Sequence, residues 1–257
     1  MDARKYPLID THVHIDELTD LEGAIRRAQS VGIGAIIGVG SDLASNEKVL
    51  QIAQTFPGYL FPALGFHPWQ IKAHQVEVTL KAMEREVDRC VAIGEVGLDF
   101  KVEVDKGLQT QIFRSILELA AERDRPVIVH ARGAWEEALS MVVEAGLEKA
   151  VFHWYSGPLG VLRRIIERGY SISGTPALSY SPRHRKAIKR MDIEGLVLET
   201  DAPQAYRGVE SEPKDLVTSL FMVADIKGMK PEEVARKTAQ NAVELFGIDP
   251  VRRREFS

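Results

Sequence analysis

The sequence VAIGEVGLDF, residues 91–100, is a short apolar run that carries one carboxylate, Glu95, between Gly94 and Gly97. Runs of this length that are rich in Val and Ile are typical of strands buried on both faces of a parallel sheet. Similar runs begin near seven other positions: Pro7, Ala35, Leu60, Pro126, Ala150, Tyr170 and Gly195. Because amphipathic segments separate these runs, the chain is predicted to contain eight alternating strand and helix units.

The clearest of the predicted helices spans residues 106–124. Its apolar side chains, among them Leu108 and Ile112, fall on one stripe at helical spacing. Eight strand and helix units are what a (β/α)₈ TIM barrel requires, and such barrels commonly contain about 250 residues. The sequence therefore predicts a protein of the α/β class with a TIM-barrel fold.

We expect the whole chain, residues 1–257, to form a single barrel domain, because no linker or low-complexity stretch interrupts the alternation. The last barrel helix is expected from Pro213 onward. A further helix is predicted over residues 231–246, and a solvated basic tail over residues 252–254.

Composition limits the class of protein further. The chain is 45% hydrophobic and 27% charged, which suits a large core with a solvated surface, and its net charge of −4 gives no global footprint for nucleic acid. Its apolar runs are shorter than the roughly 18 residues of a membrane span, and the first residues do not resemble a secretory signal, so a cytoplasmic location is expected. The single cysteine, Cys90, is interpreted as a small buried residue.

Polar residues that can bind metal ions lie at the ends of several predicted strands. They are four imidazoles and two carboxylates: His12, His14, Glu95, His130, His153 and Asp201. This set can hold two divalent cations, and a barrel gathers the carboxyl ends of its strands at one face. The sequence therefore predicts a two-metal centre and metal-assisted hydrolysis.

Four of these residues have roles that can be predicted from the sequence. His12 and His14 are separated by one residue, so both point to the same side of a strand and can chelate one cation. Glu95 is expected to bridge the two cations, the alternative being a structural ion pair with an arginine. Asp201 is predicted to bind one cation and to accept a proton from the attacking water, the alternative being a helix cap.

The ordered motifs resemble those of the TatD family of metal-dependent hydrolases, a branch of the amidohydrolase-like barrels. They are IDTHVHID (9–16), GEVGLDF (94–100), Q-x-x-x-F (109–113), PVIVHAR (126–132), HWYSG (153–157) and LVLETDAP (196–203). The resemblance extends from Ile9 to Phe246 and implies hydrolysis of phosphodiester bonds in DNA, commonly by a magnesium-dependent nuclease.

The resemblance also implies a division of the ligands between the two metals. The first metal would be held by four residues: His12, His14, Glu95 and Asp201. The second would be held by three: Glu95, His130 and His153. The identity of the metals stays open among Zn, Mn, Mg and Fe. Imidazole suits the transition metals, whereas Mg prefers oxygen ligands.

Four further residues are predicted to contact substrate. Arg132 lies on the same strand face as His130 and can bind a phosphate oxygen, unless it only covers a loop. His67 resembles the family's G-x-H-P histidine, although it could instead be a structural hydrogen bonder. Trp154 and Tyr155 can stack on a base, with a place in the core as the alternative.

A basic segment, residues 182–190, could form a phosphate groove, but a solvated helix face is the favoured interpretation. The sequence departs from the family pattern at Gly133, where Asp often follows H-x-R, and at Ser211, where Asn is expected. The loop after Asp201 is also shorter than usual. Two other functions therefore stay open: a metal-dependent hydrolase of amides, lactones or esters, and a metal-binding scaffold without catalysis. The sequence does not predict an oligomeric state.

Overall fold

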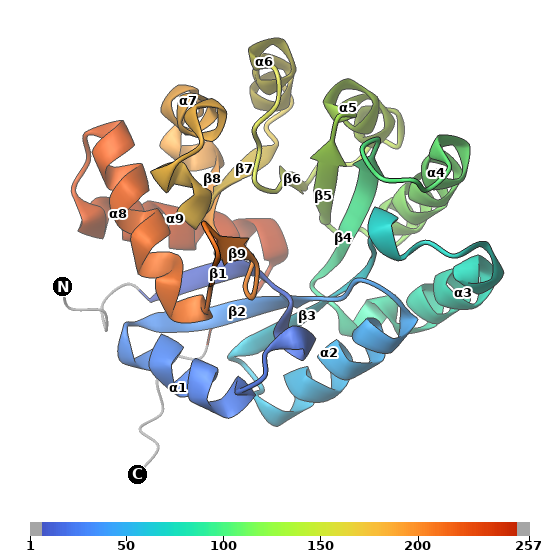
Figure 1. Ribbon diagram of the computed structural model, residues 1–257, viewed down its shortest axis with the longest axis horizontal. Helices are drawn as coiled ribbons and strands as arrows, with labels where there is room; N and C mark the ends of the chain where they lie inside the picture. Colours follow the sequence, from blue (N-terminus) through green and yellow to red (C-terminus); the bar gives the residue numbers. More distant parts are fainter. Residues whose placement is uncertain (1–6, 251–257) are drawn as a thin grey trace.

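A computed structural model describes residues 7–250 of the chain, in which eight parallel strands form a barrel surrounded by helices (Figure 1). The strand order around the barrel follows the sequence from β1 to β8. The strands are β1 (Leu8–Val13), β2 (Ile33–Val39), β3 (Leu60–Phe66), β4 (Ala92–Asp99), β5 (Val127–Arg132), β6 (Ala150–Phe152), β7 (Ser171–Gly174) and β8 (Leu196–Leu198). The predicted (β/α)₈ barrel is therefore confirmed, and each strand starts within about two residues of its predicted position.

Helices alternate with the strands. The α-helices are α1 (Leu21–Ser30), α2 (Leu43–Thr55), α3 (Val76–Glu86), α4 (Lys106–Glu122), α5 (Trp135–Glu144), α6 (Leu159–Glu167), α7 (Pro182–Arg190), α8 (Leu216–Lys227) and α9 (Pro231–Phe246). Short 3₁₀ helices are η1 (Ile15–Glu17), η2 (Pro68–Gln70), η3 (Ala73–Gln75), η4 (Val87–Arg89), η5 (Pro176–Ser179), η6 (Ile193–Gly195) and η7 (Pro213–Asp215). A two-stranded hairpin, β9 (Ala205–Tyr206) and β10 (Val209–Glu210), follows β8.

Side chains cap the starts of α1, α2, α4 and α7. At the start of α4, the Asp105 side chain accepts a hydrogen bond from the backbone N–H of Leu108. This bond satisfies one of the N–H groups that have no partner within the helix. The predicted helix over 231–246 forms with the predicted bounds. The segment from Pro213 begins as the single turn of η7 and continues as α8.

The barrel closes between its first and last strands. The backbone N–H of Asp201 donates to the carbonyl of His12 at 2.9 Å, and that of His14 donates to Ala202 at 2.8 Å. One step earlier along both segments, the buried Asp10 carboxylate accepts two hydrogen bonds from Thr200. The backbone N–H of Thr200 donates at 2.9 Å, and the Thr200 hydroxyl donates at 2.6 Å. These bonds fix the ends of β1 and β8 against each other, and with them the residues that face the barrel mouth.

Two apolar layers surround the sheet. The larger layer packs the outer faces of the strands against the helices. The smaller layer fills the barrel interior, where Ile37, Ile128 and Val197 pack against Leu245 and Phe246 of α9. Because α9 and these side chains fill the barrel at one end, the polar side chains of the strands gather at the other.

Three smaller predictions concern single segments. Cys90 is buried just before β4, as predicted, and burial raises the pKa of its thiol to about 12. Within residues 7–250, no helix combines the length and the apolar character needed to cross a membrane. The predicted basic tail, 252–254, lies outside the described residues.

Candidate metal centre

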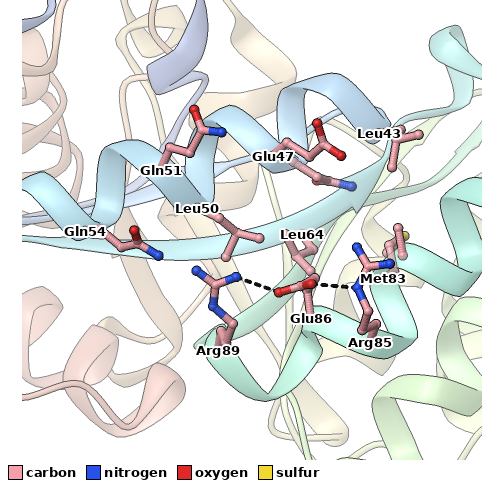
Figure 2. Close-up of a pocket in the computed structure, with 12 residues that line it drawn as sticks. Leu43, Glu47, Leu50, Gln51, Gln54, Leu64, Met83, Arg85, Glu86 and Arg89 are labelled. Carbon is pink, nitrogen blue, oxygen red and sulfur yellow. Dashed lines mark hydrogen bonds and ion pairs between the residues drawn. The ribbon is translucent and has the colours of Figure 1, made fainter.

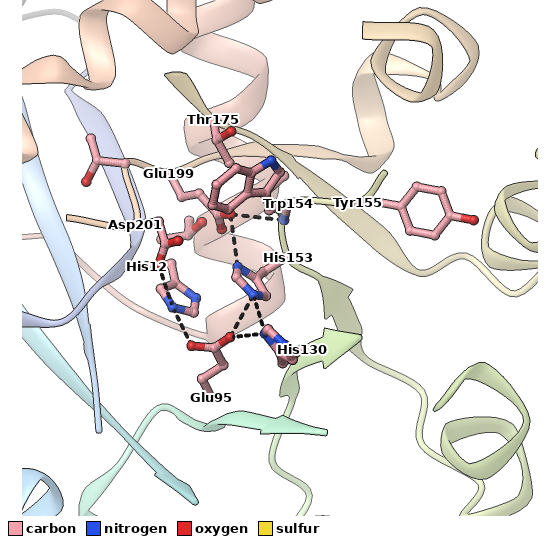
Figure 3. A network of polar contacts seen from close by, with 12 residues as sticks. His12, Glu95, His130, His153, Trp154, Tyr155, Thr175, Glu199 and Asp201 are labelled. Atoms are coloured by element: carbon pink, nitrogen blue, oxygen red, sulfur yellow. Dashed lines mark hydrogen bonds and ion pairs between the residues drawn. The ribbon is translucent and has the colours of Figure 1, made fainter. Parts of the chain in front are cut away.

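The six proposed ligands converge at the carboxyl ends of the strands, although they are distant in sequence. Five of them, all except His14, are labelled in Figure 3. They come from five strands or from the residues directly after them: β1, β4, β5, β6 and β8. Their side chains are mostly buried, and the carboxylates and imidazoles face one another. An arrangement of this kind needs either proton sharing or cations to be stable.

One side of the centre contains the two N-terminal histidines. Glu95 Oε2 lies 3.2 Å from His12 Nε2 and 3.4 Å from His14 Nε2. Asp201 Oδ1 lies 3.4 Å from the same atom of His12 and 3.5 Å from that of His14. Two imidazole nitrogens and two carboxylate oxygens thus surround one point, which is a suitable donor set for a tetrahedral divalent cation.

The other side of the centre uses the second oxygen of Glu95. Its Oε1 lies 2.7 Å from His130 Nδ1 and 2.7 Å from His153 Nε2. The nearer oxygen to His12 and His14 is Oε2, so the carboxylate faces one histidine pair with each oxygen. A carboxylate that bridges two cations needs this arrangement, so the geometry supports the predicted bridging role of Glu95.

Buried nitrogen atoms without hydrogen bonds indicate what the centre is built to hold. Among the described residues, both ring nitrogens of His12 and Nδ1 of His14 are buried without a hydrogen bond of acceptable geometry. His12 Nε2 lies close to two carboxylates, yet these contacts do not have the direction of a hydrogen bond. Burying an unpaired polar group is costly, and a cation would satisfy the nitrogen that points into the cluster. The residues present therefore fit a metal.

The carboxylates and imidazoles of the centre shift one another's pKa values. Burial would raise the pKa of Glu95, but the imidazoles of His153, His67 and His12 outweigh it and hold that pKa well below its ordinary value. Burial would lower the pKa of His14, but its carboxylate neighbours raise it to about 10. Glu95 is thus anionic at neutral pH, and a bound cation would replace the protons on His14, His130 and His153, whose pKa values the neighbouring carboxylates raise.

The backbone at the centre takes conformations that position these side chains. Asp201 has φ of 56° and Trp154 has φ of 42°, in the left-handed region that non-glycine residues seldom occupy. Gly97 has φ of 146°, and a Cβ built there would lie 2.0 Å from the carbonyl oxygen of His130. Only glycine therefore lets β4 approach β5 closely enough to bring Glu95 beside His130.

A buried carboxylate that the sequence analysis did not single out supports His130. Asp99 Oδ2 lies 3.4 Å from His130 Nε2, on the opposite side of the ring from Glu95. The same oxygen accepts bonds from Arg132 Nε at 2.8 Å and Trp69 Nε1 at 2.5 Å. Asp99 is fully buried; burial opposes its ionisation, but these donors outweigh it and lower its pKa. Its carboxylate orients the ring so that Nδ1 faces the centre.

The backbone of Asp99 is fixed as well. Its N–H donates to Gln109 Oε1 at 2.8 Å, and its carbonyl accepts from Gln109 Nε2 at 3.0 Å. Gln109 lies on α4 and is the first residue of the quoted Q-x-x-x-F motif. The signal for Asp99 was its place at the end of β4, on the GEVGLDF motif that was quoted for Glu95.

Glu199 plays the corresponding part for His153 and was also missed. Its Oε1 lies 3.3 Å from His153 Nδ1, which leaves Nε2 to face Glu95 (Figure 3). The same oxygen accepts the backbone N–H of Trp154 at 3.1 Å. Glu199 lies close enough to His12 and His153 to share a cation with them as well. The signal was its two-residue spacing from Asp201, which places both carboxylates on one side of the chain.

His67 lies in the centre and contacts Glu95. Its Nε2 is 3.3 Å from Glu95 Oε1, and its Nδ1 accepts the backbone N–H of Trp69 at 3.2 Å. Burial lowers the pKa of His67 to about 4, so the ring is neutral. Because Nδ1 accepts a bond, the proton of the neutral ring is on Nε2, which makes His67 a donor toward the centre although it is close enough to ligate.

Arg132 lies at the rim of the centre. Its guanidinium is held by Asp99 and lies 5.2 Å from the centre of the Trp69 ring, with half of the side chain exposed. Asp99 therefore holds the guanidinium through Nε, and the exposed part of the guanidinium can bind an anion. Gly133, which departs from the family pattern, has φ of 72°, a conformation that suits glycine better than Asp.

The two aromatic residues after His153 have different positions. Trp154 is partly exposed and faces the centre, whereas Tyr155 points away from it (Figure 3). The Tyr155 ring is buried against Trp135, and its hydroxyl donates to the Pro158 carbonyl at 2.6 Å. The structure does not bring Tyr155 to the centre, because a side chain that is packed and bonded in this way cannot stack on a base.

The basic segment forms α7 on the outside of the barrel. His184 faces inward, is fully buried and donates from Nδ1 to the carbonyl of Tyr155 at 2.8 Å. Arg183 and Lys186 are exposed. This placement agrees with the interpretation of the segment as a solvated helix face.

A cavity of about 240 Å³ lies elsewhere, between α2 and α3 (Figure 2). Its wall contains Leu50, Met83 and the Glu86 carboxylate, which accepts from Arg85 at 2.7 Å and from Arg89 at 2.6 Å. Two arginines thus neutralise the carboxylate of Glu86, one of the two acidic residues, with Glu47, in this wall. The chemistry of the molecule is concentrated at the strand ends and not here.

Comparisons with known proteins agree with this geometry. Residues 9–247 match the family model described as TatD related DNase. The deoxyribonuclease TATDN3 of Homo sapiens is 31% identical over 265 residues, which cover 96% of this chain and 97% of that protein. The uncharacterized metal-dependent hydrolase MJ1582 of Methanocaldococcus jannaschii is 30% identical, with 95% and 98% covered.

A solved structure resembles the barrel throughout its length. The crystal structure of YJJV, a TatD homolog from Escherichia coli, superposes with a TM-score of 0.87 at 28% identity, and covers 97% of this chain and 100% of that one. The family match extends over nearly the whole described barrel, including all six proposed ligands. The chain therefore belongs to the TatD-related deoxyribonuclease family.

Proposed function

We propose that this protein is a metal-dependent phosphodiesterase that cleaves DNA with two divalent cations bound at the barrel mouth. The observation that carries the proposal is the position of Glu95, whose two oxygens face two separate groups of imidazoles. A two-cation site suits phosphodiester hydrolysis because it activates water and neutralises charge on the phosphate. Family membership and the printed names of the relatives support DNA as the substrate.

The protein groups have distinct roles in this proposal. Two ligand sets hold the cations, one of His12, His14, Glu95 and Asp201, the other of Glu95, His130 and His153. Asp201 receives the proton of the attacking water, since its carboxylate is anionic: burial would raise its pKa, but the imidazoles of His14, His12 and His153 hold it below its ordinary value. His67 donates from Nε2 to a phosphate oxygen, and Arg132 binds another.

The donor atoms of the centre favour some metals over others. The centre offers more imidazole nitrogen than Mg²⁺ usually accepts, so Zn, Mn or Fe suit it better than Mg. We propose two such ions for each chain. A cytoplasmic location and the single-domain organisation of residues 1–257 stay predictions, and the oligomeric state stays open.

The variant Glu95→Gln tests the proposal directly. It keeps the size of the side chain but leaves one oxygen and one amide, so it cannot bridge two cations. We expect activity on single-stranded DNA to fall about 100- to 1,000-fold, the loss typical of removing an electrostatic catalyst. Glu77→Gln on α3 is the matched control, because the Glu77 side chain is exposed and pairs with Lys81 on the surface. Unchanged DNA cleavage by folded Glu95→Gln protein would refute the proposal.

Panels of amide, lactone and ester substrates, assayed beside DNA, address the alternative hydrolase. Turnover of such a substrate in the absence of DNA cleavage would favour it. Metal-dependent turnover of any substrate would rule out the scaffold alternative. Family membership supports phosphodiester hydrolysis over both.

A further inference from the structure

Three loops at the barrel mouth bring aromatic rings together beside the metal centre. Trp154 follows β6, Tyr180 follows η5 and Tyr206 belongs to β9. The Trp154 and Tyr206 rings lie 5.4 Å apart, and those of Tyr206 and Tyr180 lie 6.5 Å apart. The guanidinium of Arg207 lies 5.4 Å from the Tyr180 ring centre. We call these four residues the aromatic cluster.

The aromatic cluster is fixed to the metal centre by hydrogen bonds. Tyr206 donates from its hydroxyl to the carbonyl of Thr200 at 2.8 Å, next to Asp201. Trp154 directly follows His153, and its backbone N–H donates to Ser173 Oγ at 2.7 Å. The rings are therefore held at a set position relative to two of the proposed ligands.

The hairpin that carries Tyr206 and Arg207 is closed at its base. Both the backbone N–H and the hydroxyl of Ser211 donate to the carbonyl of Gln204, at 3.1 and 2.9 Å. The next residue, Glu212, is paired with Arg27 of α1 at 2.7 Å. Ser211, which replaces the Asn expected in the family, thus holds a hairpin in place over the β1 and β8 side of the barrel.

The outer part of the cluster is open to solvent. Tyr180 is 37% exposed, although an aromatic ring of its size is more often covered. Arg207 is exposed, and its backbone has φ of 54°, a conformation that non-glycine residues seldom occupy. An exposed ring with a neighbouring cation suits a ligand in which a flat π system lies next to an anionic group.

A second pair of the same kind lies on the opposite arc of the barrel. Trp69, after β3, is 52% exposed and has Arg132 at 5.2 Å from its ring centre. The metal centre thus lies between two pairs of an arginine and an exposed aromatic ring. A strand that crosses the mouth would meet one pair on each side of the phosphate that is cleaved.

We propose that the aromatic cluster is a nucleobase subsite, in which a base beside the scissile phosphate stacks on Tyr180 and Arg207 binds the adjoining phosphate. The inference rests on the proposed function, because it names how the DNA substrate is recognised at that same centre. It explains how a protein of net charge −4 can select nucleic acid from other phosphodiesters.

The test compares two substrates and one binding measurement. The substrates are a single-stranded oligonucleotide and glycerophosphoglycerol, a small diester without a nucleobase or any other aromatic ring. For Tyr180→Ala, the ratio of kcat/KM on the oligonucleotide to kcat/KM on the small diester should fall on the order of tenfold, through KM. Tyr180→Phe, which keeps the ring, should restore the wild-type ratio. Phe221→Ala, which removes an exposed ring on α8, is the matched control.

Binding of a fluorescein-labelled oligonucleotide, read by fluorescence anisotropy, separates this inference from the proposed function. Weaker binding by Tyr180→Ala than by the wild type, with or without turnover, supports the subsite. Equal binding and an unchanged kcat/KM ratio would overturn the subsite, while DNA cleavage by the wild type would leave the proposed function standing. A wild type that binds the oligonucleotide through Tyr180 but does not cleave it would overturn the proposed function and keep the subsite.

Discussion

Replacing Asp99 with Asn tests whether a buried carboxylate outside the ligand set controls the metal centre. The substitution keeps the shape of the side chain but removes the charge that holds three donors on one oxygen, those of His130, Arg132 and Trp69. An amide in this place cannot accept all three. We therefore expect the His130 ring to lose its fixed orientation toward Glu95.

The magnitude follows from two independent estimates. Removing a residue that orients a metal ligand costs roughly 10- to 100-fold in metal affinity or activity. One charge-assisted hydrogen bond contributes about 1.5–3 kcal/mol, and about 1.4 kcal/mol corresponds to tenfold, so both estimates agree. The contact with Arg132 adds little to stability, because that side chain is half exposed and screened by water.

The assay is a metal titration of the metal-free protein, followed by DNA cleavage and by the thermal midpoint. For Asp99→Asn we expect the metal concentration at half activity to rise about 10- to 100-fold. Asp105→Asn is the matched control, because Asp105 caps α4 and Asn caps a helix equally well. Coincident titrations of Asp99→Asn and the wild type, together with equal kcat/KM, would refute an orienting role for Asp99.

Two other predictions concern the rim and the strand contact. Arg132→Ala should raise KM for DNA on the order of tenfold, as expected for the loss of one charge-assisted bond, and reduce its salt dependence, without shifting the metal titration; a shifted titration with unchanged KM would count against a phosphate role. Gly97→Ala should lower the free energy of unfolding by about 1–3 kcal/mol in a denaturant titration, because its Cβ would clash with the carbonyl oxygen of His130. An unfolding midpoint equal to that of the wild type would show that β4 and β5 can separate without cost.

The fold could be predicted from the sequence because each barrel strand is a short apolar run buried on both faces. Such runs are visible even where the strand is only three residues long, as at Ala150–Phe152. The ligands were visible for the same reason, since a His or carboxylate at the end of an apolar run is conspicuous. The close approach of Glu95 to both histidine groups follows from the barrel, which joins strand ends that are distant in sequence.

The residues that support the ligands could not be predicted in the same way. Asp99 and Glu199 lie on quoted motifs, but their importance depends on which imidazole nitrogen each one faces, and that is a property of the folded site. Tyr155 was predicted to contact substrate because it lies two residues after His153 in the sequence. The chain leaves the strand after Phe152, and Trp154 takes a left-handed conformation, so the alternation of a strand does not extend to Tyr155.

Anomalous diffraction from crystals of the metal-loaded protein tests the central claim most directly. Two peaks should lie roughly 3.5 to 4 Å apart with Glu95 between them, one beside His12, His14 and Asp201 and the other beside His130 and His153. A single peak that does not touch Glu95, or peaks remote from these imidazoles, would contradict the account.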